Sequence, residues 1–85
     1  MGERGEEVRL AARALLARVL PHARSRAETP VTGDVLAEAN ALLVRARAAV
    51  PESPLIAAMR PLGAGSTLAE LTTRLAALER AITFV

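Results

Sequence analysis

The 85-residue chain contains no cysteine, lysine, tryptophan or tyrosine, and Phe84 is its only aromatic residue. Without cysteine the chain can form neither a disulfide nor a thiolate metal site. His22 is the only histidine, so the sequence also lacks the clustered imidazole ligands of a zinc site. We therefore expect no bound metal and no cofactor.

Long hydrophobic runs are absent as well. A helix that crosses a bilayer needs about 20 predominantly apolar residues, and arginines interrupt every candidate stretch of this chain. The first seven residues are acidic rather than basic, unlike the start of a secretory signal. We therefore expect no membrane association and a cytoplasmic location.

Arginine provides all 11 basic residues, and the formal net charge is only +2. The missing lysine, beside frequent alanine, glycine and proline, is typical of a GC-rich genome and favours a bacterial protein. The alternative is that arginine was selected for its planar guanidinium, which binds phosphate and carboxylate groups through paired hydrogen bonds. The sequence leaves both interpretations open.

Apolar residues recur at steps of three and four along most of the chain, which predicts helices rather than strands. A chain of this length forms one domain at most, here residues 1–85. We predict an all-α fold, a small antiparallel four-helix bundle with short connections. The predicted helices span residues 3–20, with a kinked extension to residue 27 as an alternative end, and residues 34–50, 54–60 and 67–83.

Local signals set the ends of the first three predicted helices. Pro21 ends or kinks the first, because proline lacks the amide hydrogen that a helix interior needs. Asp34 is the predicted N-cap of the second helix, with Thr32 as a second candidate. Ser53 is the predicted cap of the third, followed by Pro54 at the first helical position.

The last predicted helix carries a regular apolar stripe. Its members are Leu68, Leu71, Leu75, Leu78, Ile82 and Val85. This alternation of three and four resembles the spacing of a coiled-coil heptad. Thr67 and Glu70 form a capping box at the start of the helix. Small residues beside the stripe suit close packing, so we predict that it is the centre of a monomeric bundle, with a homodimer contact as the alternative.

Residues that could carry catalysis are scarce. His22 has no second histidine, cysteine or carboxylate at ligand spacing, and no serine lies in a G-x-S-x-G elbow. Residues 63–67, Gly-Ala-Gly-Ser-Thr, precede a helix as a phosphate-binding loop does. They lack the lysine and the preceding strand of such a loop. We expect no catalytic residues and no enzyme activity.

Surface residues instead indicate a protein–protein interaction module, either an adaptor or a small subunit of a larger assembly. The expected partner is another protein or a second copy of the chain. A mixed apolar and polar patch is typical of a small contact surface. The candidate interface residues are Asn40, Val44 and Arg47 in the second predicted helix, and Ile82 and Val85 near the end of the last.

The alternative function is binding to the backbone of RNA or DNA through surface arginines, which can position phosphate groups. The candidate phosphate contacts are Arg9, Arg13 and Arg24. Glu6 lies three residues before Arg9 and can pair with it, the net charge is low, and the chain lacks aromatic residues for base stacking. The sequence therefore favours the protein partner.

Overall fold

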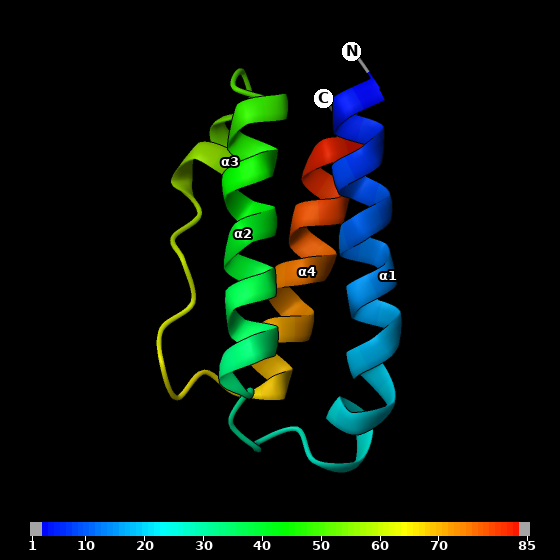
Figure 1. The fold of residues 1–85 in the computed structure, drawn as a ribbon, viewed down its shortest axis with the longest axis vertical. Helices are drawn as coiled ribbons and strands as arrows, with labels where there is room; N and C mark the ends of the chain where they lie inside the picture. Colours follow the sequence, from blue (N-terminus) through cyan, green and yellow to red (C-terminus); the bar gives the residue numbers. More distant parts are fainter. Residues whose placement is uncertain (1–2, 84–85) are drawn as a thin grey trace.

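A computed structural model describes the backbone of residues 3–83 and the side chains of residues 5–83, which form four helices (Figure 1). These are α1 (Glu3–Ser25), α2 (Gly33–Ala49), α3 (Pro54–Ala58) and α4 (Leu68–Thr83). Within this part of the chain there are helices and turns but no strand, only one isolated bridge between Pro30 and Thr67. The predicted all-α bundle is confirmed.

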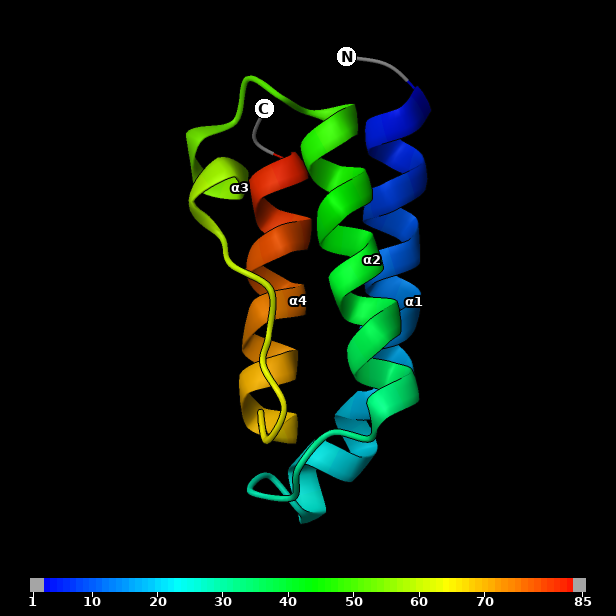
Figure 2. The same ribbon diagram turned by 60° about the vertical axis from the view of Figure 1, so that its left-hand side comes forward.

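The three long helices lie side by side, and α3 is a short helix next to α2 and the second half of α4 (Figures 1 and 2). The molecule measures 36 × 21 × 18 Å. Helix α1 runs antiparallel to both α2 and α4 (Figure 1). Helices α2 and α4 run in the same direction, because the segment between α3 and α4 returns along almost the whole length of the bundle (Figure 2).

The apolar stripe of α4 lies in the core. Leu71, Leu75, Leu78 and Ile82 are buried, and Leu68 is partly buried against them; Val85 falls outside the described residues. The stripe packs against apolar faces of α1 and α2, whose buried members are Val8, Ala12, Leu15, Val19, Ala39, Leu42, Leu43, Ala46 and Val50. The chain itself therefore covers the stripe that the sequence had left open to a second copy.

Helix α1 continues through Pro21 to Ser25, beyond the predicted end at residue 20 and close to the alternative end at 27. It bends near this end, so that its last turn lies beneath the bundle (Figures 1 and 2). A proline inside a helix removes one main-chain hydrogen bond and kinks the axis. Here the turn after the proline is retained, and it buries Ala23.

Two predicted helix ends need correction. The N-cap of α2 is Thr32, whose backbone is extended, whereas Asp34 lies in the first turn; its negative charge there suits the helix dipole. Helix α3 ends at Ala58 rather than residue 60, and Met59 is already extended. The following Arg60 precedes Pro61, which disfavours helical backbone. The predicted cap is confirmed, because Ser53 Oγ accepts a hydrogen bond from the Ile56 amide at 3.2 Å.

The start of α4 forms the predicted capping box. The Thr67 amide donates to Glu70 Oε1 at 2.8 Å, and the Glu70 amide donates to Thr67 Oγ1 at 3.2 Å. The amides of Leu68 and Ala69 donate to the carbonyl oxygens of Thr29 and Ala27, each at 2.9 Å. The α1–α2 connection is thereby tied to α4, and the amides at this helix start are satisfied within the chain.

None of the helices in residues 3–83 combines the length and the apolar character needed to cross a membrane.

Candidate functional site

An open groove of about 940 Å³ lies between α3 and the second half of α4. Figure 2 shows the two helices next to each other on this side of the molecule. We call it the α3–α4 groove. Its lining residues are Glu52, Ser53, Pro54, Leu55, Ala58, Met59 and Arg60 from α3 and its flanks, and Arg74, Ala77, Arg80 and Ala81 from α4.

The apolar part of the groove combines short side chains with one exposed leucine. Ala58, Ala77 and Ala81 contribute only methyl groups. Leu55 has 65% of its surface exposed, the highest value among the exposed large hydrophobic residues of the described chain. An exposed leucine beside a mostly alanine floor leaves room for apolar side chains from another molecule.

The charged part of the groove is predominantly positive. Arg60, Arg74 and Arg80 line it against a single carboxylate, Glu52. Arg74 Nη1 donates a hydrogen bond to the main-chain oxygen of Arg60, so the connection before α4 is attached to α4 itself. Arg60 and Arg80 are exposed, and none of the ion pairs formed by the described residues involves these three arginines.

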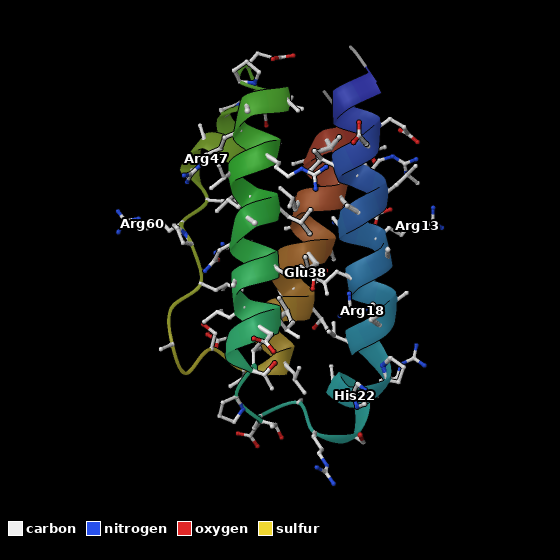
Figure 3. All side chains as sticks on the ribbon, in the orientation of Figure 1. Arg13, Arg18, His22, Glu38, Arg47 and Arg60 are labelled. Atoms are coloured by element: carbon white, nitrogen blue, oxygen red, sulfur yellow. The ribbon has the colours of Figure 1, made fainter. Side chains whose placement is uncertain are left out.

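The wall of the groove is held in place from α2. Asn40 Nδ2 donates to the Leu62 carbonyl oxygen at 3.0 Å, and the Leu62 amide donates to Asn40 Oδ1 at 2.8 Å. About two turns further along the same helix, Arg47 Nη2 donates to the Met59 carbonyl oxygen. These bonds fix both ends of the segment 59–62. Figure 3 shows Arg47 on the side of α2 that lies next to α3. The segment that borders the groove is therefore held to α2 by hydrogen bonds at Met59 and Leu62.

The same bonds correct the expected exposure of the α2 patch. Val44 is exposed, as predicted, with 62% of its surface accessible. Asn40 and Arg47 are partly buried and hold the returning chain. Arg47 Nε is buried without a hydrogen-bond partner among the described residues. The α2 interface thus stays a prediction, but only Val44 of its three members is an exposed side chain.

Ile82, the other candidate of the interface that the structure describes, is buried in the core with 5% of its surface exposed. Its spacing was that of the apolar stripe, and the stripe faces α1. Val85 lies outside the described residues. The burial of Ile82 gives no support to its role in a partner contact, which stays a prediction.

Two of the candidate phosphate contacts gather around one carboxylate. Arg9 Nε donates to Glu6 Oε1 at 2.9 Å, and Arg9 Nη1 lies 3.7 Å from Glu79 Oε2. The hydrogen bond from Arg9 lowers the pKa of the Glu6 carboxyl below its ordinary value. Arg13 Nε lies 3.9 Å from the same oxygen of Glu79, and its side chain projects outward from α1 (Figure 3). Arg24 is exposed in the last turn of α1, after the bend.

The structure also places the other residues that the sequence suggested for chemistry. His22 is exposed near the bend of α1 (Figure 3). Residues 5–83 contain no group of three or more histidine, cysteine, aspartate or glutamate side chains that could hold a metal ion. The amides after the Gly-Ala-Gly-Ser-Thr loop already donate within the chain, so they are not directed toward a phosphate.

The sequence alone did not predict the groove. One signal could have indicated it. Arg74, Ala77 and Arg80 follow each other at steps of three, from the edge of the apolar stripe of α4 toward its exposed side. Two arginines separated by alanine on an exposed helix face are consistent with a shallow charged surface. The second wall, α3, could not be placed from its own five residues.

No protein-family model matches the chain, and neither does any curated protein or any solved structure. The function must therefore be inferred from the geometry of the groove.

Proposed function

We propose that the chain is a non-catalytic protein-interaction module, an adaptor or small subunit of a larger assembly, and that it binds through the α3–α4 groove. The observation that supports this most is the exposed Leu55 beside an alanine floor in an open groove of about 940 Å³. Exposed apolar surface rimmed by polar groups marks protein contact sites. The proposal retains the cytoplasmic location expected from the sequence.

The composition of the groove agrees with the anatomy of protein interfaces. Such interfaces have an apolar centre and a polar rim, and they are enriched in arginine and methionine. The groove holds Leu55 and Met59 with Arg60, Arg74 and Arg80 around them. Binding through it requires little rearrangement, because hydrogen bonds from α2 and α4 already fix the segment that leads out of α3.

Capture from an extract of the source organism tests the proposal when three variants are compared with the wild type. Leu55→Asp places a charge in the groove, Leu10→Asp is the matched control on α1, and Val44→Asp probes the α2 surface; all three leucine or valine side chains are at least half exposed. Circular dichroism checks that each variant is folded. We expect the wild type, Leu10→Asp and Val44→Asp to capture the same partner protein, and Leu55→Asp to fail to capture it.

The captured protein is then purified and its affinity for the four forms is measured by calorimetry. A partner that binds Leu55→Asp as tightly as wild type would refute the groove as the binding surface. Loss of binding in Val44→Asp alone would move the interface to α2, as the sequence had predicted.

Binding to an RNA or DNA backbone receives less support from the geometry. Arg9 is hydrogen-bonded to Glu6 and lies close to Glu79, and Arg13 shares Glu79. A neighbouring carboxylate competes with phosphate for the same guanidinium and repels its negative charge. Retention of nucleic acid at low salt that Arg9→Ala with Arg13→Ala abolishes would favour this alternative.

A further inference from the structure

The charges of the α3–α4 groove select the chemistry of what occupies it. Three arginines, Arg60, Arg74 and Arg80, face one carboxylate, Glu52. Arg60 and Arg80 are exposed and pair with no carboxylate of the described residues. Contact surfaces carry complementary charge, because like charges brought together raise the free energy of the complex. The occupant that fits is therefore acidic along its edges.

The shape of the groove selects an apolar stripe between those edges. Ala58, Ala77 and Ala81 provide short side chains, and Leu55 forms an exposed wall. Short side chains allow a second helix to approach closely and leave space for its larger residues. Arg74 and Arg80 are six residues apart on α4, about 9 Å along the axis. A helix lying along the groove presents carboxylates about 10.5 Å apart, close to this separation, from positions seven residues apart on one face.

The backbone around the groove favours binding of a helix over binding of an extended peptide. A bound strand needs a sheet edge with free amide and carbonyl groups. Residues 3–83 contain no strand, and the groove is lined by two helices and the segments that flank α3. An extended peptide would leave its main-chain groups unpaired against an apolar floor, whereas a helix pairs them internally.

We infer that the α3–α4 groove binds an acidic amphipathic helix of a partner protein, and this inference rests on the proposed function. The apolar side chains of that helix lie against Leu55 and the alanine floor. Its carboxylates lie beside Arg60, Arg74 and Arg80. A second copy of the chain fits less well, because a symmetric contact would bring two copies of this predominantly positive groove together.

Selection from a displayed helix library tests the occupant directly. The helices are about 18 residues long, enough to fold in isolation. Leucine is fixed along one stripe, and the flanking positions are randomised among glutamate, glutamine and lysine. The library is selected on the whole protein. We expect glutamate to be enriched over lysine at the flanking positions and the selected peptides to lose binding to Leu55→Asp.

Charge reversal provides the specific control. Arg60→Glu with Arg80→Glu changes two exposed groove residues and spares the Arg74 contact to the Arg60 main chain. We expect this variant to bind the selected acidic peptides about tenfold or more weakly and to select lysine in their place. Arg26→Glu, an exposed arginine outside the groove, should change neither result. Thermal melting checks that both variants fold.

Several outcomes overturn the acidic helix. In the library these are equal recovery of glutamate and lysine, or the absence of any enriched peptide whose binding depends on Leu55. In solution they are competition by polyuridylate with the peptides at moderate salt, or self-association of the chain that Leu55→Asp abolishes. If a natural partner still depends on Leu55 while the library shows no preference for glutamate, the proposed function stands and this inference fails. If neither depends on Leu55, both fail.

Discussion

At the scale of single residues, Asn40 shows what a helical pattern leaves open. It lies on the face of α2 away from the apolar positions, which the sequence analysis took for a solvent-exposed surface. In the structure both atoms of its amide are hydrogen-bonded to the main chain of Leu62. A side-chain amide can form its hydrogen bonds either with water or with another segment of the chain. The neighbouring residues in the sequence do not show which of the two it will be.

Replacement of Asn40 tests this role. Asn40→Ala removes both hydrogen bonds and leaves the partly buried main-chain groups of Leu62 unpaired. We expect the free energy of unfolding to fall by about 1–3 kcal/mol. Val44→Ala, one turn further along α2 and exposed, should change it by no more than about 0.5 kcal/mol. Urea denaturation measures both, and equal values for the two variants would show that the Asn40–Leu62 hydrogen bonds do not stabilise the fold.

Glu6 carries a pH dependence of known sign. The hydrogen bond from Arg9 lowers its pKa in the folded chain from the ordinary value of 4.5. The unfolded chain therefore binds the proton more readily, and the pair stabilises the fold above pH 4.5. This contribution disappears as the pH falls through the lowered folded-state pKa. We expect Glu6→Gln to lessen the acid sensitivity of the urea midpoint, by a small amount because the pair is exposed.

An unchanged acid sensitivity in Glu6→Gln would show that this pair does not contribute to folding.

At the scale of whole elements, all four helices were predicted, and the strength of the local signals decided how accurately their ends were placed. The capping box and the apolar stripe placed α4 almost to the residue, because both signals lie within the helix itself. Pro21 is ambiguous, since a proline either ends or bends a helix, and packing of Ala23 against the bundle retains the last turn of α1. Five-residue α3 has a cap but too few residues for a periodic pattern.

The stripe of α4 can be tested as the centre of the core. Leu75 and Leu78 are each only 1% exposed. We expect Leu75→Ala or Leu78→Ala to lower the free energy of unfolding by about 2–5 kcal/mol, through lost apolar contact and the cavity left behind. Leu10→Ala removes the same atoms from a half-exposed position and is the matched control. Thermal stability of Leu75→Ala or Leu78→Ala close to that of Leu10→Ala would show that the core lies elsewhere.

At the scale of the whole molecule, the path of the chain creates the groove. A short turn between α2 and α4 would make those helices antiparallel. Instead the chain forms α3 at one end of the bundle and then returns along it before α4 begins (Figure 2). Hydrogen bonds from Asn40, Arg47 and Arg74 hold this return path. These contacts join residues 12 to 22 positions apart, and so no local pattern could place the groove.

The same path determines the expected oligomeric state. The spacing of the α4 stripe is compatible with a homodimer, but its residues Leu71, Leu75, Leu78 and Ile82 are already covered by α1 and α2. A symmetric contact through the groove would also bring its arginines close to those of the second copy. We therefore expect light scattering to give the mass of a single chain for wild type, Val44→Asp and Leu55→Asp alike. A concentration-dependent dimer that either variant dissociates would show that an exposed apolar residue, Val44 or Leu55, serves contact between copies. That result would contradict the inference that the α3–α4 groove binds an acidic helix of a different protein.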